Sequence, residues 1–304
     1  MIEEFKRSGE RFAPLVPEFA EMVLIEVTTR CNLACSHCPH SELATHDGFL
    51  GDIDASLYRK IVDEIAPFPD TWLRPFNGGE PMLRRELPEM IRYAKDKGIR
   101  NIAITSNGTL LTARMRKDLI EAGLDHLEVS IDAATEETYQ EIRHAPMFQR
   151  VVDNTLRYIE ESKRVSAART VMVSFVVQAA NRQEIAAFHS FWRGKADAVY
   201  LREYHQHNNL VVRQSSPAVN SPEYRHPCPY IFERLIVHHN GKVRFCEADW
   251  EAKHAIGDAR TQSLLEIWQG ESYRRLREQH IAGTFDHPFC RNCTDWKEVH
   301  WPGQ

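Results

Sequence analysis

The sequence predicts an α/β fold with a mainly parallel sheet and a small C-terminal module. Between residues 22 and 205, six short apolar, β-branched runs alternate with segments of helical period. A stretch rich in Pro, Ser and Asn then interrupts the pattern at 207–229. After it, an Asn-Gly turn between two apolar runs predicts a β-hairpin, and an amphipathic helix follows. These observations predict a βα-repeat domain joined to a hairpin-plus-helix module.

Each predicted strand ends in a polar group. The predicted strands are 23–29, 72–79, 101–108, 126–132, 170–178 and 198–205. The predicted helices are 54–66, 85–98, 112–123, 136–143, 148–164 and 182–194. Asp54 and Thr112 are the expected N-caps, and Gly98 the expected helix stop. Such strands form a parallel sheet that closes as a partial barrel or lies open and doubly wound, with ligand chemistry at the carboxyl ends.

The C-terminal module is predicted to hold the hairpin at 234–246 and one helix over 263–283. On that helix, Arg274, Arg275 and Arg277 stand near acidic residues, so we expect a solvated face of mixed charge. The predicted segments are an N-terminal extension at 1–20, the repeat domain at 21–210 and the module at 211–304.

Composition is that of a soluble globular protein, with 42% apolar and 27% charged residues in 304. No apolar run reaches the roughly 18 residues of a membrane span, and the charged N-terminus is unlike a secretory signal. We therefore expect a cytoplasmic protein without a membrane partner. The net charge of −5 gives no reason to expect nucleic acid as a partner.

The seven cysteines fall into a set of three and a set of four. Cys31, Cys35 and Cys38 form CxxxCxxC directly after the first strand. This loop predicts either a [4Fe–4S] cubane with one iron left free or a zinc site completed by His37 or His40. The other four, Cys228, Cys246, Cys290 and Cys293, predict a closed site, either structural zinc or a fully ligated cluster.

At this point the sequence resembles the radical S-adenosylmethionine (SAM) superfamily. The resemblance rests on the three cysteines, on Gly78-Gly79-Glu80-Pro81 after the second strand, and on segments 106–108, 130–132 and 141–148. It implies a partial (β/α)6 barrel, and a [4Fe–4S] cluster on the three cysteines whose free iron takes the SAM amino and carboxylate groups. The positions that match the family's SAM contacts are His37, Gly78, Gly79, Glu80, Ser106, Asn107, Ser130 and Arg143.

Individual roles follow from the same resemblance. Gly78 and Gly79 are expected to bring backbone to the SAM amine, while Glu80 complements that cation or braces the turn. Ser106, Asn107 and Ser130 suit ribose hydroxyls, and Arg143 suits the SAM carboxylate. The family usually has an aromatic residue just before the third cysteine, where this chain has His37.

The C-terminal cysteines resemble the shortened SPASM module called Twitch, which holds one auxiliary [4Fe–4S] cluster. Length and cysteine layout are most similar to the radical SAM dehydrogenases of aminoglycoside biosynthesis, such as 2-deoxy-scyllo-inosamine dehydrogenase. That resemblance implies oxidation of a secondary alcohol of an aminocyclitol or sugar, with the auxiliary cluster accepting an electron. It also implies an external one-electron reductant such as flavodoxin or ferredoxin.

Alternatives remain open from sequence. They are a peptide maturase, a redox-neutral epimerase or dehydratase acting on a sugar, and a zinc-stapled binding protein. The segment before the first strand predicts no extra peptide-binding domain, and no cysteine is left to return hydrogen in an epimerase. The candidate catalytic residues at the end of the sixth strand are Glu203, Tyr204 and His205, with Arg74 and Asn77 as further candidates to face substrate.

Overall fold

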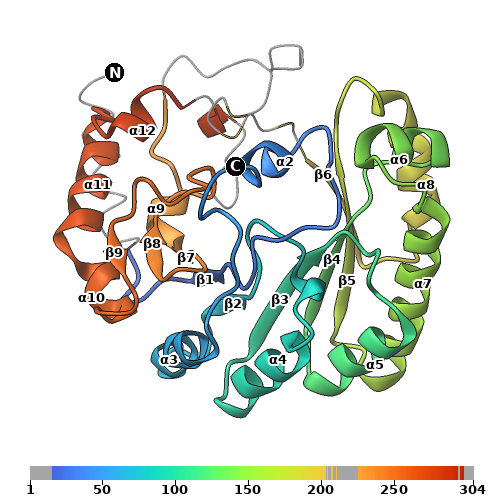
Figure 1. The fold of residues 1–304 in the computed structure, drawn as a ribbon, viewed down its shortest axis with the longest axis horizontal. Helices are drawn as coiled ribbons and strands as arrows, with labels where there is room; N and C mark the ends of the chain where they lie inside the picture. The colour runs from blue at the N-terminus through green and yellow to red at the C-terminus, as the bar shows by residue number, and fades with distance from the viewer. Residues whose placement is uncertain are drawn as a thin grey trace.

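The computed structural model describes residues 16–202, 204, 207, 210, 225–293 and 295–297. Within these residues, nine strands form one sheet in the order β6-β5-β4-β3-β2-β1-β7-β8-β9. Strands β1 to β6 pair in parallel with their neighbours, as predicted. Since β6 and β9 lie at opposite ends, the sheet does not close, and the fold is a partial barrel with a C-terminal module (Figure 1).

The six barrel strands stand where the sequence predicts them, but they are shorter. Their bounds are β1 Met22–Ile25, β2 Trp72–Arg74, β3 Asn101–Ser106, β4 His126–Ser130, β5 Thr170–Val176 and β6 Ala198–Arg202. The polar ends of the predicted runs leave the sheet as loops. Many of the candidate site residues lie in those loops, whereas Arg74, Ser106 and Ser130 are the last residues of β2, β3 and β4.

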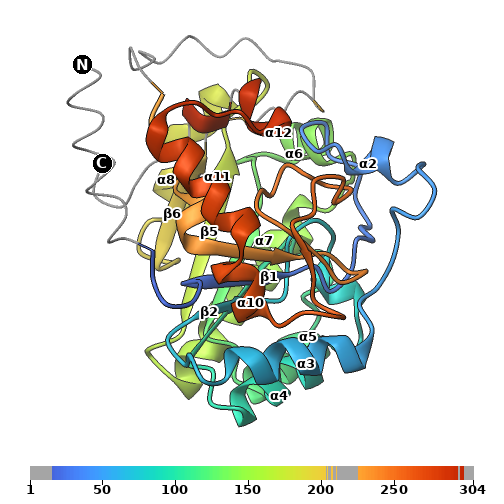
Figure 2. The ribbon, with the colours of Figure 1, turned by 90° about the vertical axis from the view of Figure 1, so that its left-hand side faces the viewer.

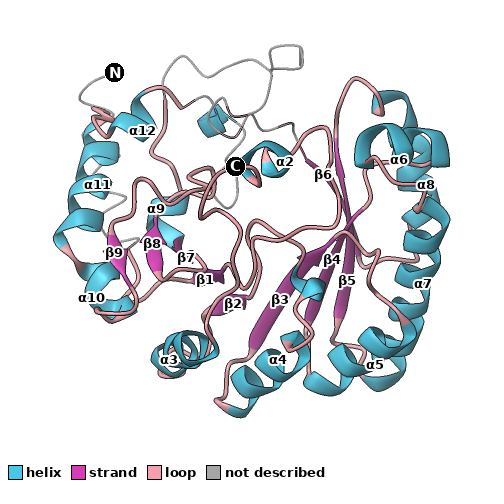
Figure 3. Ribbon diagram, viewed as in Figure 1, coloured by secondary structure: helices cyan, strands magenta, loops and turns pink. Residues whose placement is uncertain are grey.

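Helices cover the outer side of the parallel strands (Figure 3). They are α3 Ala55–Ile65, α4 Leu87–Asp96, α5 Ala113–Ala122, α6 Glu136–Arg143, α7 Phe148–Val165 and α8 Ile185–Trp192, the last preceded by the 3-10 turn η3 Arg182–Glu184. The predicted caps are confirmed, since Asp54 accepts hydrogen bonds from the amides of Ser56 and Leu57 and Thr112 from that of Met115. The short elements α2 His40–Leu43 and η2 Pro81–Leu83 are additional.

The C-terminal hairpin is confirmed and extends the barrel sheet. Strands β7 Arg234–Val237 and β8 Lys242–Arg244 pair antiparallel, and β8 pairs with β9 Gly257–Asp258. Strand β7 also pairs in parallel with β1, with Met22 opposite Arg234. The module's sheet is therefore continuous with the strand that leads into the first cysteine loop. The turns α9 Tyr230–Glu233, α12 Pro288–Arg291 and η4 Asp295–Lys297 complete the module.

The prediction of one helix over 263–283 is wrong, because the chain forms α10 Leu264–Gln269 and α11 Glu271–Ala282 instead. Gly270 between them is extended, with φ −67° and ψ 164°, and a Cβ there would lie 2.8 Å from the Glu266 carbonyl oxygen. This break lets the two helices lie over the hairpin strands (Figure 2). The prediction of a solvated face also fails at Arg277, which is buried and donates to the carbonyls of Ile231 and Trp268.

One hydrophobic core runs through the barrel and the module. Val23 and Ile25 of β1, Leu235 and Val237 of β7, and Trp268 of α10 all belong to it. The predicted domain boundary at 210 stays a prediction, because most of the chain around it lies outside the described residues. None of the helices in the described part combines the length and the apolar character that a membrane span requires.

Candidate active site between two cysteine clusters

A cavity of about 350 Å³ opens at the carboxyl ends of the parallel strands. Every barrel strand contributes to it directly or through the loop that follows it. From β1 to β6 these contributions include Cys31, Asn77, Ser106, Ser130, Val176 and Tyr204. The module closes the far side with Tyr230, Arg234, Glu247 and Trp250. Strands distant in sequence meet here because parallel strands present their carboxyl ends at the same edge.

The loop with the first three cysteines lies at one wall of this cavity. Cys35 is buried with Leu33 and Ala145, and Cys31 and Cys38 pack against this group. The Cys38 amide donates to the Cys35 carbonyl at 3.1 Å, and the Ser36 amide donates to Ile142 of α6 at 2.9 Å. Burial raises the pKa of Cys31 to about 11 and that of Cys38 to about 12. The thiols are therefore neutral until a metal centre displaces their protons.

Neither candidate histidine for the zinc alternative turns toward these thiols. His40 is buried, and its Nε2 lies 2.6 Å from the Thr29 carbonyl oxygen. The His37 ring lies between Gln178, 3.3 Å from its Nδ1, and Asp132, 3.6 Å from its Nε2. Burial lowers the pKa of His37 to about 4, so the ring is neutral. His37 lines the cavity, and its contact with SAM stays a prediction.

The Gly-Gly turn after β2 packs against the backbone of the cysteine loop. A Cβ on Gly79 would lie 2.5 Å from the carbonyl oxygens of Thr28 and Arg30. The Glu80 amide donates to the same Arg30 carbonyl at 2.7 Å. Only a residue without a side chain permits this approach. The turn therefore sets the position of the loop that carries Cys31.

Glu80 braces this turn, which is one of its two expected roles. Its buried carboxylate accepts hydrogen bonds from the Ser106 hydroxyl at 2.9 Å and the amides of Met82 and Asn107 at 3.0 and 2.8 Å. Burial raises the pKa of Glu80, and these hydrogen bonds oppose that shift. Its interaction with a SAM amine stays a prediction.

The predicted ribose contacts all line the cavity, but their polar groups have protein partners. Asn107 donates to Asn32 at 2.9 Å and accepts from the Thr109 amide at 3.0 Å. Ser130 accepts a long hydrogen bond of 3.4 Å from the Ser174 hydroxyl. The structure brings Ser106, Asn107 and Ser130 to one wall, and their contact with SAM stays a prediction.

Arg143 forms a buried ion pair rather than a surface one. Its Nη2 lies 2.6 Å from Asp132 Oδ2, and its Nη1 donates to the Cys35 sulfur at 3.4 Å. A guanidinium at this place offsets the negative charge of a thiolate on Cys35. Asp132, unassigned by the sequence, is fully buried and positions this arginine. Binding of the SAM carboxylate by Arg143 stays a prediction.

A second polar group at the far wall was not assigned from sequence. Arg202 of β6 binds Glu128 of β4 through contacts of 2.7 and 2.8 Å. Burial acts to raise the pKa of Glu128, but the positive charges of Arg202 and Arg74 have the larger combined effect. The pKa of Glu128 is therefore lowered. Arg234 and Glu247 form another pair at this wall. In the sequence, Glu128 stands out only as a charged residue inside the predicted strand at 126–132.

Of the predicted catalytic residues, Tyr204 is buried and lines the cavity. Burial raises the pKa of its phenol. Glu203 and His205 lie outside the described residues. Arg74 and Asn77, the other candidates to face substrate, both line the cavity.

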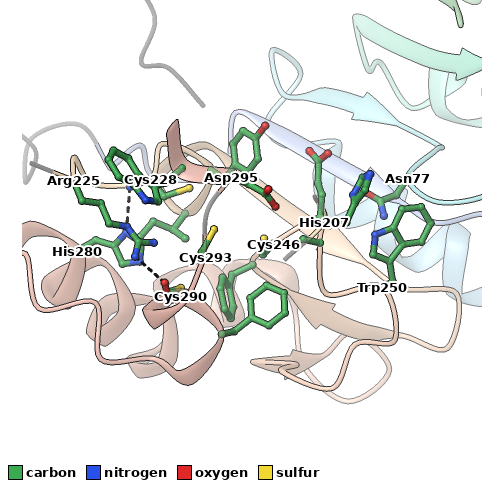
Figure 4. A pocket seen from close by; sticks show the side chains of 17 residues that line it. Asn77, His207, Arg225, Cys228, Cys246, Trp250, His280, Cys290, Cys293 and Asp295 are labelled. Atoms are coloured by element: carbon green, nitrogen blue, oxygen red, sulfur yellow. Dashed lines mark hydrogen bonds between the residues drawn. The ribbon is translucent and has the colours of Figure 1, made fainter. Parts of the chain in front are cut away.

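The other four cysteines surround a smaller cavity of about 150 Å³ in the module (Figure 4). Cys228 precedes α9, Cys246 follows β8, and Cys290 and Cys293 lie in and after α12. Burial raises the pKa of Cys228 and of Cys290 to about 12. The fold thus gathers four thiols from three separate segments, which suits a fully ligated cluster.

Polar contacts hold the chain around these thiols. The Cys228 amide donates to His280 Nδ1 at 3.1 Å, and Arg225 donates to the Cys290 carbonyl at 2.8 Å. The Cys293 amide donates to the same carbonyl at 3.1 Å. The thiols themselves are left to face the cavity.

The two cavities share a wall. The residues that line both are Asn77, His207, Tyr230, Glu247 and Trp250. Among the described residues, the space beside Cys31, Cys35 and Cys38 therefore adjoins the space among the other four cysteines.

Comparison with known families fits this arrangement. The Radical SAM superfamily matches residues 25–191, which is more than half of the chain. This chain belongs to the radical SAM superfamily. The iron–sulfur cluster-binding domain SPASM matches residues 228–294. Enzymes of this superfamily bind SAM at a [4Fe–4S] cluster, and the SPASM domain adds a further iron–sulfur cluster.

Similar proteins have diverse activities. Fe-coproporphyrin III synthase of Methanosarcina barkeri is 37% identical over 123 residues, covering 38% of this chain and 28% of its own. GTP 3′,8-cyclase of Chlorobaculum tepidum is 32% identical over 169 residues, covering 55% and 48%. This chain therefore spans less than half the length of either. The tungsten-containing aldehyde ferredoxin oxidoreductase cofactor-modifying protein of Pyrococcus furiosus is 26% identical, covering 89% and 86%.

Solved structures share the fold along most of the chain. BtrN in complex with AdoMet and 2-DOIA is 18% identical, with a TM-score of 0.61 and coverage of 91% of this chain and 93% of its own. Streptococcus suis SuiB bound to precursor peptide SuiA is 14% identical, with a TM-score of 0.70 and coverage of 89% and 70%. At these identities the likeness shows the fold.

Proposed function

We propose that this radical SAM enzyme is a dehydrogenase that oxidises a secondary alcohol of a small polar substrate, an aminocyclitol or a sugar, to a ketone. The observation that carries the proposal is the wall shared by the two cysteine-lined cavities. A substrate in the larger cavity lies between a site for hydrogen removal and a site for electron removal. That order suits an oxidation by two electrons.

We assign Cys31, Cys35 and Cys38 to the SAM-binding cluster and the other four cysteines to the auxiliary cluster. When bound, SAM with its cluster supplies a 5′-deoxyadenosyl radical that takes a hydrogen atom, and the auxiliary cluster supplies an electron acceptor. The three-thiol loop fits an open site, because the imidazoles of His37 and His40 contact other groups. An external one-electron reductant such as flavodoxin or ferredoxin is part of the same proposal.

Conversion of H–C–OH to C=O releases a hydrogen atom, an electron and the hydroxyl proton. The proton needs a base near the place where the electron leaves. Glu247 directly follows Cys246 and lines both cavities, so it is our candidate for this base within the described residues. Arg234 holds its carboxylate. Glu203 and His205 remain candidates from sequence.

A redox-neutral outcome would need a hydrogen donor to the substrate radical. All seven cysteines are assigned as cluster ligands in this proposal, which leaves no thiol for that step. Tyr204 is buried in the cavity wall with its phenol neutral, and it is the candidate donor for epimerisation. The absence of a spare thiol favours oxidation over epimerisation.

A second candidate is modification of an organic cofactor or a peptide. The relative from Pyrococcus furiosus, whose name describes a cofactor-modifying protein, aligns along 89% of this chain. SuiB, solved with a precursor peptide, covers a similar share. Both support a larger substrate than a sugar.

The test is anaerobic incubation of the reconstituted enzyme with SAM, reductant and candidate sugars, aminocyclitols and peptides. The proposal expects one 5′-deoxyadenosine per product, and a product oxidised by two electrons at a carbinol carbon. A redox-neutral product carrying solvent deuterium at the abstracted carbon refutes the dehydrogenase and leaves the superfamily assignment intact. Turnover with a peptide alone would favour the second candidate.

Glu247→Gln tests the base. It should lower ketone formation at least tenfold while substrate-dependent 5′-deoxyadenosine persists, because hydrogen removal precedes loss of the proton. Glu251→Gln is the matched control, since Glu251 lies in the same loop but lines neither cavity and pairs with Lys253. Equal loss in both variants, or no loss in either, removes Glu247 from this role.

A further inference from the structure

Three arginines line the far end of the larger cavity, and they differ in how they are paired. Arg202 binds Glu128 at 2.7 and 2.8 Å, and Arg234 binds Glu247. For Arg74, the last residue of β2, the nearest carboxylate oxygen belongs to Glu128 and lies 3.9 Å away. Among the described lining residues at this end, three guanidinium groups therefore face two carboxylates.

Arg74 is the one without a carboxylate at hydrogen-bonding distance. Its Nη2 donates to the neutral hydroxyl of Thr105 at 2.6 Å, and its buried Nε has no hydrogen-bond partner. The side chain is only 20% exposed. A buried cation that no carboxylate reaches by a hydrogen bond is poorly compensated, so this position favours an anionic ligand.

The pKa directions agree with the geometry. Burial lowers the pKa of Arg74, and Glu128 does not compensate for it. Burial also acts to lower the pKa of Arg202 and of Arg234, but their partners Glu128 and Glu247 outweigh it and the net direction is upward.

We infer that Arg74 binds a carboxylate or phosphate group of the substrate. This inference rests on the proposed function and narrows its substrate to an acidic sugar. The amines of an aminocyclitol would bring a second cation to a guanidinium that no described carboxylate reaches by a hydrogen bond. A planar guanidinium can hold either anion by two parallel hydrogen bonds. The Glu128–Arg202 pair forms the wall of the cavity next to Arg74. With its anionic group held by Arg74 beside this wall, the substrate would be oriented, and so would its hydroxyl-bearing carbon.

The experiment measures binding to the reconstituted enzyme with SAM, without reductant, by calorimetry at equal ionic strength. The probes share one ring: D-glucuronate, D-glucose 6-phosphate, D-glucose and D-glucosamine. At least one acidic probe should bind about tenfold more tightly than glucose or glucosamine, as expected for one charge-assisted contact. Preference for glucuronate or for the phosphate ester identifies which anion the site takes.

Two variants with opposite expected effects keep the test decisive. Arg74→Gln should abolish the preference for the acidic probe, and Arg74→Lys should restore part of it. Glu128→Gln removes a competing carboxylate at nearly constant size, so it should tighten binding of the acidic probe severalfold. Arg100→Gln, at an exposed arginine outside the cavity, should change nothing.

Equal affinity for all four probes in the wild-type enzyme, including no binding at all, overturns the inference. The inference is also overturned if Arg74→Gln still prefers the acidic probe. Where that variant does not fold, a preference for the acidic probe that is unchanged in Glu128→Gln overturns it instead. The outcome is separate from the proposed function. If the enzyme oxidises a neutral sugar to a ketone and binds acidic probes no more tightly, the dehydrogenase proposal holds and the Arg74 inference fails. If it prefers acidic probes but forms a redox-neutral product, the Arg74 inference holds and the dehydrogenase proposal fails.

Discussion

A buried ion pair ties the C-terminal module to the barrel, and its removal should be strongly destabilising. Arg244 of β8 and Glu26, the residue after β1, are both fully buried, with 3.1 Å between Nη2 and Oε1. Glu26 also lies 3.3 Å from His238 Nε2, and Arg244 donates to the Asp249 carbonyl. Glu26 comes shortly before Cys31, and Arg244 shortly before Cys246. The pair therefore links the two segments that lead into Cys31 and Cys246.

Arg244→Met keeps the side-chain length but leaves Glu26 as a buried charge without its cation. Breaking a buried pair in this way costs about 3–5 kcal/mol. That is a large share of a total stability of about 5–15 kcal/mol. For a chain of this size, the cost corresponds to roughly 5–8 °C in the unfolding midpoint. Urea unfolding followed by circular dichroism measures the free energy directly.

Two further variants separate the charge effect from simple loss of packing. The double variant Glu26→Gln/Arg244→Met removes both charges and should recover much of the lost stability. Arg100→Met breaks the exposed pair with Asp70, whose side chains are 66% and 81% exposed, and should cost at most about 1 kcal/mol. The reasoning is refuted if Arg244→Met costs no more than Arg100→Met, or if the double variant is as unstable as the single one.

Three other outcomes are expected. Gly79→Ala puts a Cβ 2.5 Å from two carbonyl oxygens, so it should lower the free energy of unfolding in urea by about 1–3 kcal/mol and weaken SAM binding. Gly98→Ala is the control, because its Cβ would meet no atom within 4 Å. It should cost only the backbone strain of its φ of +89° and leave SAM binding unchanged. Burial, with a smaller effect of Arg244, lowers the pKa of His238 from 6.5 to about 4. As the pH falls, His238 therefore takes up a proton in the unfolded chain before it does so in the folded one. The free energy of unfolding should fall by up to about 3 kcal/mol between pH 6.5 and pH 4, and His238 should cause no loss above pH 6.5. A His238→Asn variant with the same pH profile of stability would contradict this. Alanine at any one of Cys228, Cys246, Cys290 and Cys293 should remove roughly half of the iron and leave the SAM-binding cluster, as iron analysis and SAM binding report; unchanged iron in all four variants would overturn the partition of the cysteines.

Much of the local structure follows from the sequence, because its causes act over a few residues. Asp54 and Thr112 cap their helices through amides two and three positions ahead, so the pattern is visible in the chain itself. The prediction failed at Gly270, since the apolar spacing of 263–283 continues across a break of one residue. Arg277 was misassigned for a similar reason, because helical period alone does not tell which arginine α9 and Trp268 will cover.

The sequence by itself determined the chemistry of the two centres. Three cysteines in one loop and four in a second region specify thiol sites through their spacing, and the Gly78-Gly79-Glu80-Pro81 turn marks the loop that packs beside the first. The tertiary structure alone decided what lies between these centres. Glu128 meets Arg202 across 74 positions of sequence, and Arg244 meets Glu26 across 218. Such pairs depend on which strands become neighbours, and β7 joins β1 through backbone hydrogen bonds that no side-chain pattern encodes. The wall shared by the two cavities, the charges that line it and the position of Arg74 beyond hydrogen-bonding distance of any described carboxylate therefore appear only when the chain is folded.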